Sequence, residues 1–181
     1  MNNKILTNIS TSQEFLKKKD FDSAEKILLE NLEISSESFE TFFLLGTISG
    51  IKKNLDEAKI YLKKAINLNS SHINSLLNLA IIEKKLNKKN ESINYFKKIL
   101  KLDENNLEGL CGLAQIFEED ENFSMAETYF KKVLEIDANH HVANHSYGKL
   151  LLKLNHHSDG LKLIEKVSGI IRFKKKNLEI I

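Results

Sequence analysis

The sequence predicts an all-α protein, a solenoid built from antiparallel helix pairs. Two observations carry this prediction: a period of 34 residues, and a helical spacing of apolar residues that occurs twice in each period. One position of the period is marked by Leu45-Gly46, Leu79-Ala80, Leu113-Ala114 and Tyr147-Gly148. A second position, later in each repeat, is marked by Ala58, Ser92, Ala126 and Gly160. Self-similarity at such a period is the sequence signature of a repeat array.

Each period is expected to form two helices with a short polar break between them. In residues 39–72, apolar residues follow helical spacing before Asn54 and again from Ala58 to Leu68. Two helices can cross at close range only where neither carries a bulky side chain at the contact. We therefore expect Gly46 and Ala58 at the crossing of the two helices.

The start of each second helix carries its own signal. Side chains of Asp, Asn and Ser accept hydrogen bonds from the free N–H groups of a helix N-terminus. Such residues recur at the 34-residue spacing, at Asp22, Asp56, Asn90, Ser124 and Ser158. They predict five repeats, of which the outer two are the least regular, at residues 5–38, 39–72, 73–106, 107–140 and 141–168.

Composition and charge exclude several classes of protein. The chain has 181 residues, 41% hydrophobic and 29% charged, and a single cysteine, Cys111, which cannot form an internal disulfide. It contains no run of about 18 apolar residues that would span a membrane. The opening MNNKILTNIS lacks the apolar core and cleavage site of a secretory signal. We expect a cytoplasmic protein with no membrane partner.

The positive charges are balanced and repeat with the period. The formal net charge is only +2, and the paired lysines lie at Lys63-Lys64, Lys97-Lys98 and Lys131-Lys132. Binding of nucleic-acid phosphates needs a clustered excess of positive charge. We therefore predict that these lysines lie on an outer, solvent-exposed face of the helical array, and we expect no nucleic-acid partner.

On these residues the chain resembles the tetratricopeptide repeat family, whose 34-residue unit carries W-x-x-L-G-x-x-Y, then A-x-x-x-F, then P. The matching residues are Leu45-Gly46, Ala58, Leu62 and Ala65, then Leu79-Ala80, Ser92 and Phe96, then Leu113-Ala114, Phe117, Ala126, Phe130 and Val133. The resemblance covers roughly residues 5–168. It implies a right-handed superhelix whose first helices line a concave groove for an extended peptide or a helix. The chain departs from the pattern in having no proline, and Asn144 replaces a large aromatic residue, so the last repeat is expected to be the loosest.

The resemblance also implies which side chains face the groove. They are Phe43, Thr47, Leu77, Ile81, Lys84, Cys111, Gln115, His145 and Lys149. Phe43, Leu77 and Ile81 predict a partner with an apolar segment, unless these residues are buried between neighbouring first helices instead. Relatives that hold acidic chaperone tails use Lys, Arg and Asn at such places. The central repeats offer Phe, Thr, Leu and Ile there, so we do not expect a chaperone-tail adaptor.

The sequence predicts no metal, no cofactor and no catalytic residue. His140, His141 and His145 cluster, but His156 lies about 16 Å farther along a helix, too far to share an ion with them. Cys111 occupies a helical position where a thiol is usually a modest hydrophobe. There is no phosphate-binding glycine loop, nucleophile elbow or HExxH motif. We therefore expect no enzymatic activity.

The pattern changes at the end of the array. Residues 169–181 contain Gly169, alternating apolar residues and a run of three lysines, Lys174, Lys175 and Lys176, and do not resemble the polar helix that usually caps a repeat array. They are expected to form a tail that folds back as a strand or short helix, or a connector to another domain or chain.

Two functions of different class follow. The preferred one is a free-standing, non-catalytic scaffold that binds a peptide or helix of a partner protein in its groove. The alternative is an accessory module of an enzyme, for example of a transferase or an oxygenase, whose catalytic domain is absent from the chain. A third alternative is self-association through the C-terminal end.

Overall fold

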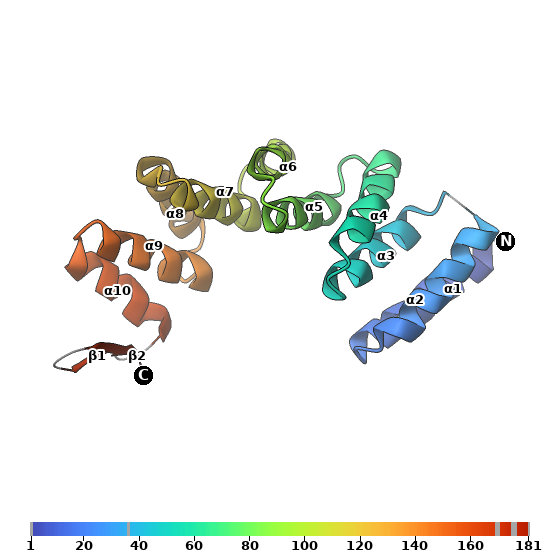
Figure 1. The fold of residues 1–181 in the computed structure, drawn as a ribbon, viewed down its shortest axis with the longest axis horizontal. Coiled ribbons are helices and arrows are strands. Elements are labelled where there is room, and N and C mark those ends of the chain that lie inside the picture. Colours follow the sequence, from blue (N-terminus) through green and yellow to red (C-terminus); the bar gives the residue numbers. More distant parts are fainter. Residues whose placement is uncertain (1, 36, 169–170, 175–176, 181) are drawn as a thin grey trace. The chain divides into compact units, whose positions relative to one another are not determined.

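The computed structural model describes residues 2–35, 37–168, 171–174 and 177–180. Within these ranges ten helices follow one another in pairs, and two short strands come after them (Figure 1). The elements are α1 (Asn2–Lys17), α2 (Phe21–Ile34), α3 (Phe39–Ile51), α4 (Leu55–Leu68), α5 (Ile73–Lys85), α6 (Lys89–Leu102), α7 (Leu107–Glu119), α8 (Phe123–Ile136), α9 (His141–Lys153), α10 (His157–Ser168), β1 (Ile171–Lys174) and β2 (Asn177–Ile180). The prediction of an all-α array of about five helix pairs is confirmed.

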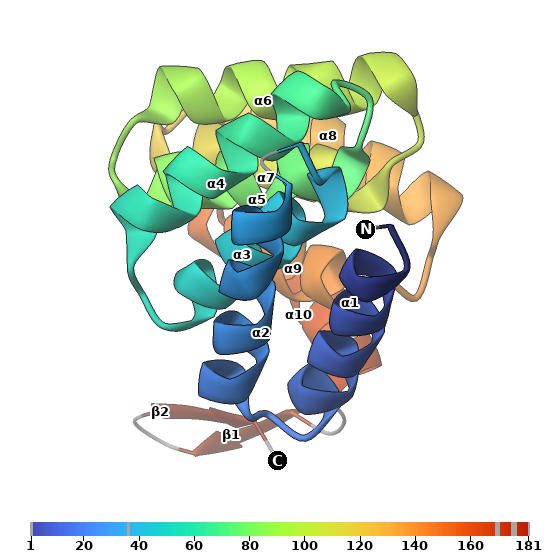
Figure 2. The same cartoon turned by 90° about the vertical axis from the view of Figure 1, so that its right-hand side faces the viewer.

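Consecutive helices pack against each other as antiparallel partners. Figure 2 shows this clearly for α1 and α2, which lie side by side. A Cβ atom on Gly46 would lie 2.6 Å from Cγ of Leu62, and a Cβ atom on Gly148 would lie 2.8 Å from the carbonyl oxygen of Gly160. No ordinary side chain fits at these distances. The close crossing of two small residues is found at Gly148 and Gly160, whereas Gly46 lies against the bulky Leu62 and Ala58 lies beside Gly50, so the predicted pairing of Gly46 with Ala58 was wrong.

The two helices of each pair are joined by the same left-handed turn. One residue of each turn has a φ angle between 57° and 67°, at Lys19, Lys53, Asn87, Glu121 and Asn155. In the second pair, the N–H of Lys53 donates to the carbonyl of Gly50 and that of Asn54 donates to the carbonyl of Ser49, at 3.2 and 2.9 Å. This hydrogen-bond pattern ends a helix by satisfying its last carbonyls. The sequence did not signal it, because glycine, the usual residue there, is absent.

The second helices begin two residues earlier than the cap pattern predicted. The caps are residues such as Asp20 and Asn122, whose side chains accept from the N–H of Ser23 at 3.1 Å and of Met125 at 3.3 Å. The prediction of capping residues was therefore wrong at Asp22, Asp56, Asn90, Ser124 and Ser158, each of which is the second residue of its helix. Polar and acidic residues are also favoured in a first turn, so the period was correct and the cap position was not.

The chain folds into two compact units, Met1–Lys98 and Ile99–Ile181, and the boundary between them falls within α6. The first unit has an apolar core that includes the fully buried Leu45 and Leu62, and the second has one around Phe130. Within the described residues, every helix is too short or too polar to cross the hydrocarbon core of a bilayer.

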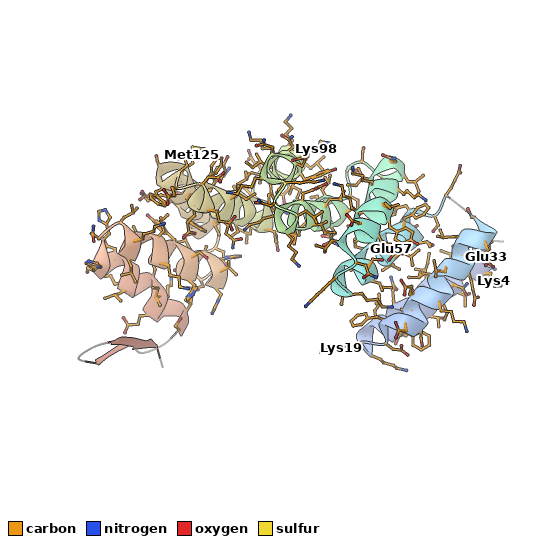
Figure 3. All side chains as sticks on the ribbon, in the orientation of Figure 1. Lys4, Lys19, Glu33, Glu57, Lys98 and Met125 are labelled. Atoms are coloured by element: carbon orange, nitrogen blue, oxygen red, sulfur yellow. The ribbon has the colours of Figure 1, made fainter. Side chains whose placement is uncertain are left out.

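Five of the six paired lysines are exposed on the second helices, as predicted, and Lys132 is half-buried. Lys63, Lys64, Lys97 and Lys98 are all exposed, and Lys98 points away from the body of the first unit in Figure 3. Two of these side chains lie over aromatic rings, with Nζ of Lys64 5.2 Å from the centre of the Phe42 ring and Nζ of Lys98 5.5 Å from that of Tyr95. Such side chains cover apolar surface while their charge stays in water.

The C-terminal segment forms a two-stranded antiparallel hairpin. Ile171 pairs with Ile180, and Lys174 pairs with Asn177. A strand was one of the two forms predicted for this tail, whereas its packing over the last repeat and the domain boundary at residue 168 stay predictions. Residues 169–170, 175–176 and 181 of the predicted tail lie outside the described residues.

Candidate functional site

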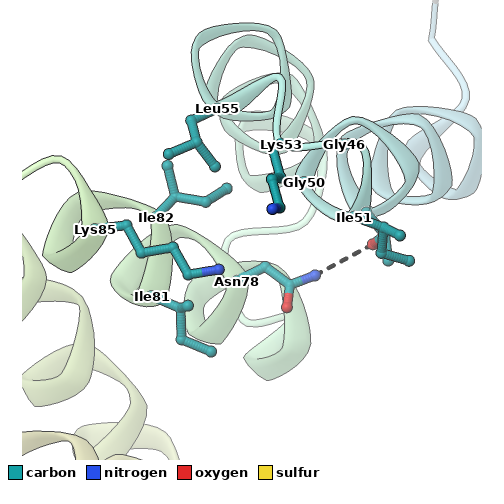
Figure 4. Close-up of a pocket in the computed structure, with 10 residues that line it drawn as sticks. Gly46, Gly50, Ile51, Lys53, Leu55, Asn78, Ile81, Ile82 and Lys85 are labelled. Atoms are coloured by element: carbon teal, nitrogen blue, oxygen red, sulfur yellow. Dashed lines mark hydrogen bonds between the residues drawn. The ribbon is translucent and has the colours of Figure 1, made fainter.

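A pocket of about 310 Å³ lies in the first unit between α3 and α5, beside the first turn of α4 (Figure 4). Its lining residues are Gly46, Thr47, Gly50, Ile51, Lys53, Leu55, Asn78, Ile81, Ile82 and Lys85. Ile51 and Ile81 are 50% and 40% exposed, so the apolar surface is accessible from solvent. Among the described residues, no carboxylate takes part in this lining.

The pocket exists because α3 lacks side chains along part of the wall that it forms. A Cβ atom on Gly50 would meet only Cβ of Ala58, at 3.9 Å, so the space beside this glycine is open. The left-handed turn at Lys53 then reverses the chain and brings Leu55, the first residue of α4, to the same pocket. The pocket is thus lined by α3 and α4 of one helix pair and by α5 of the next pair.

A side-chain hydrogen bond joins the two helices that flank the pocket. Nδ2 of Asn78 on α5 donates to Oγ1 of Thr47 on α3 at 3.2 Å, the bond that is dashed in Figure 4. Oγ1 of Thr47 in turn donates to the carbonyl oxygen of Phe43 at 2.8 Å. Because both side chains are partly buried, this chain of hydrogen bonds holds α3 and α5 at a defined separation.

Two lysines bring positive charge to the pocket. Figure 4 shows the side chains of Lys53 and Lys85 extending toward the same space, Lys53 from above and Lys85 from the left. Among the residues that the structure describes, neither forms an ion pair. Other lysines of this unit do: Lys52 pairs with Asp22 and Glu25, and Lys59 pairs with Glu83. The pocket therefore combines accessible apolar surface with two cations that no carboxylate neutralises.

An aromatic cluster lies toward the N-terminal ends of the same two helices. The ring of His72, the residue before α5, makes edge contacts with Phe39 and Phe43, each at 4.7 Å between ring centres. Nδ1 of His72 accepts from the N–H of Ser75 at 3.2 Å and so caps α5. Burial lowers the pKa of His72, against a smaller opposite effect of Glu40. The ring therefore caps the helix in its neutral form, because a protonated Nδ1 cannot accept a hydrogen bond.

Two of the predicted groove residues of the first unit line this pocket, namely Thr47 and Ile81. Phe43 is half-buried in the aromatic cluster instead, which agrees with the alternative that it is a packing residue. Leu77 and Lys84 are half-buried and do not belong to the pocket lining. The prediction that all five form one binding face therefore stays untested.

Ile51 and Lys53 line the pocket but were not among the predicted groove residues. Ile51 lies four residues after Thr47 on α3, one helical turn farther along the same face, so continuing the pattern by one turn would have included it. Lys53 had no such signal. It reaches the pocket because it occupies the left-handed position of the turn.

The remaining predicted residues belong to the second unit, on α7 and α9. Cys111 is buried, and burial raises the pKa of its thiol to about 11, which leaves it protonated at neutral pH. Gln115 is half-buried and Lys149 is exposed. Burial, followed by the charges of Lys149 and His141, lowers the pKa of His145. Within the described residues, no three histidine, cysteine or acidic side chains are arranged to hold a metal ion.

A second hollow, of about 430 Å³, lies in the second unit among α8, α9 and α10. Its charges are largely paired. Glu127 accepts from Lys131 and from the hydroxyl of Tyr147, both at 2.8 Å, and Lys162 lies 3.3 Å from Asp159. These groups already have partners, so the first pocket is the stronger candidate for binding.

Comparison with known proteins agrees with this architecture. Residues 39–72, 73–106 and 107–140 each match the profile of the tetratricopeptide repeat. No curated protein sequence matches the chain significantly. Among solved structures, PilF of Pseudomonas aeruginosa is similar with a TM-score of 0.81 at 17% identity, over 93% of this chain and 78% of that one.

Two further structures show the same fold. MamA of Desulfovibrio magneticus RS-1 is similar with a TM-score of 0.80 at 14% identity, over 91% of this chain and 93% of that one. YrrB, a tetratricopeptide repeat protein with an unusual peptide-binding site, gives 0.73 at 18% identity, over 90% of this chain and 84% of that one. Because three consecutive repeat matches cover more than half of the sequence, the chain belongs to the tetratricopeptide repeat family.

Proposed function

We propose that this protein is a non-catalytic cytoplasmic scaffold that binds a peptide or helix of a partner protein, and that the pocket between α3 and α5 is its main anchor site. The observation that carries the proposal is the pocket itself: about 310 Å³ of open space with two exposed isoleucines at its mouth. Family membership supports it, because repeat arrays of this kind present extended surfaces to other proteins. The peptide-binding site of YrrB supports it as well.

The size and stiffness of the pocket suit one or two anchoring side chains. A volume of about 310 Å³ is at the lower end of the range for small-molecule sites, and it opens on solvent along the helices. Each aliphatic side chain that becomes fully buried contributes about 1.5–3 kcal/mol before the cost of ordering the partner. The Asn78–Thr47 hydrogen bond keeps the two walls in place before binding, which reduces that cost.

The test compares two double variants in the same unit. Ile51→Ser with Ile81→Ser removes the exposed apolar surface at the pocket. Ile60→Ser with Leu68→Ser removes similar exposed surface, 56% and 46% exposed, that does not line the pocket. Each variant and the native chain are used to capture proteins from an extract of the source organism, and a captured protein is then purified and titrated by calorimetry.

We expect the native chain and the control variant to bind the same partner, and the pocket variant to bind it at least tenfold more weakly. A partner that binds all three forms with equal affinity would show that the pocket is not the site. Circular dichroism spectra that match the native protein will show that the exposed substitutions leave the helices intact.

A further inference from the structure

The pocket between α3 and α5 carries a charge pattern that restricts the chemistry of its partner. We infer that it recognises a segment in which an aliphatic side chain stands next to a carboxylate, with the aliphatic group between Ile51 and Ile81 and the carboxylate between Lys53 and Lys85. This inference rests on the proposed function, because it assumes that the pocket is the anchor site.

Apolar and cationic groups occupy different parts of this small pocket. The apolar lining comes from the last turn of α3, the first residue of α4 and the middle of α5, whereas the two ammonium groups come from the turn after α3 and the last residue of α5. In Figure 4 both lysine side chains extend over the same space that Ile81 and Ile51 border. A ligand that fills this space meets both kinds of surface at once.

Covering the ammonium groups of Lys53 and Lys85 with an apolar segment costs desolvation free energy. Lys53 and Lys85 are exposed, and among the described residues no carboxylate lines the pocket or pairs with either lysine, so a wholly apolar segment seated there would remove part of the water from two ammonium groups without replacing it. Desolvating an uncompensated charge is strongly unfavourable. A carboxylate beside the aliphatic group supplies the compensation, and it speeds association by attraction at longer range.

Several carboxylates of the first unit form ion pairs with lysines that lie outside this pocket. Glu14 pairs with Lys17, Asp22 and Glu25 pair with Lys52, and Glu83 pairs with Lys59 on α4, and none of these residues lines the pocket. Lys52 and Lys53 are neighbours in sequence, yet only Lys52 is paired to α2. The left-handed conformation of Lys53 directs the second lysine to the pocket instead.

The experiment uses a display library of random nine-residue peptides, selected on the full chain at low salt. We expect the enriched peptides to share an aliphatic residue adjacent to Asp or Glu. Their affinity should fall about tenfold in the variant Lys53→Gln, Lys85→Gln, and should weaken with added salt. The control variant Lys63→Gln, Lys97→Gln loses the same charge from exposed positions outside the pocket, and its affinity should equal that of the native chain.

A charge reversal makes the test decisive. The variant Lys53→Glu, Lys85→Glu should select peptides with Lys or Arg in place of the acidic residue. Peptides that lose affinity in the Ile51→Ser, Ile81→Ser variant but bind the Lys→Gln variant normally would overturn this inference and leave the proposed function standing. Peptides that bind the isoleucine variant as well as the native chain, or a library that yields no binder, would overturn both.

Discussion

The buried ion pair between Lys59 on α4 and Glu83 on α5 allows a sharp test of how adjacent helix pairs are held together. Nζ of Lys59 lies 2.6 Å from Oε1 of Glu83, whose side chain is only 2% exposed, and Oε2 of Glu83 is buried with no hydrogen-bond partner among the described residues. The hydrogen bond to Glu83 raises the pKa of Lys59, so the lysine is charged at neutral pH. Lys59→Met removes the cation and leaves the carboxylate buried and uncompensated, which costs about 3–5 kcal/mol.

The assay is urea denaturation followed by circular dichroism at neutral pH. The double variant Lys59→Met, Glu83→Leu removes both charges and fills the space with apolar groups, so we expect it to recover most of the lost unfolding free energy. A cost below about 1 kcal/mol for Lys59→Met alone would refute the reasoning, because it would mean that water reaches Glu83. A double variant no more stable than Lys59→Met would show that the loss comes from packing and not from charge.

Three further predictions concern a helix cap, the turns between paired helices and the glycines inside the helices. Because burial lowers the pKa of His72 below its usual value near 6.5, the unfolded chain binds more protons as the pH falls below that value. The unfolding free energy should therefore decrease from about pH 7 to about pH 5, and His72→Asn, which keeps a capping acceptor but does not titrate, should reduce that slope in urea titrations; an unchanged slope contradicts the assignment. Glu121→Gly relieves the left-handed strain of the α7–α8 turn and should raise the unfolding free energy by about 0.5–1 kcal/mol, whereas Asn87→Gly should gain less, because asparagine tolerates this conformation. Gly148→Ala places a Cβ atom 2.6 Å from Cγ1 of Ile164 and should cost about 1–3 kcal/mol, while Gly50→Ala meets only Cβ of Ala58 at 3.9 Å and should stabilise α3 by about 0.5–1 kcal/mol; thermal unfolding that ranks the two glycine variants in the other order would contradict the packing argument.

Sequence periodicity predicted the helix pairs well because the apolar spacing and the small residues where helices cross are local signals that recur in every repeat. Gly46 and Gly148 sit at helix crossings where their lack of a side chain is required, as their 34-residue spacing suggested. The caps were predicted two residues too late, because Asp22 and Asp56 are typical of both a cap and a first turn. The left-handed turn residues carried no signal at all, since lysine and glutamate there follow no local preference.

The candidate site was predicted only in part, because a site depends on which faces remain uncovered after packing. Two of the predicted groove residues, Thr47 and Ile81, line the pocket between α3 and α5, and their role in binding stays a prediction. Phe43 has the same spacing as Thr47 and a larger apolar side chain, yet it packs against His72 and Phe39. Which of these side chains stays accessible is determined by the neighbouring helix pair, whose contribution does not appear in the local pattern.

The sequence by itself determined the repeat period, the helix pairs, the family and the outward position of the lysines, because each of these depends on interactions within about one repeat. The tertiary structure alone decided that Lys53, brought in by a left-handed turn, and Lys85, at the end of the next first helix, share one pocket with Ile51 and Ile81. The physical reason is that the pocket is the space left where two helix pairs meet and Gly50 offers no side chain to fill it. Empty space of this kind arises from packing between repeats, so no single residue of the sequence signals it.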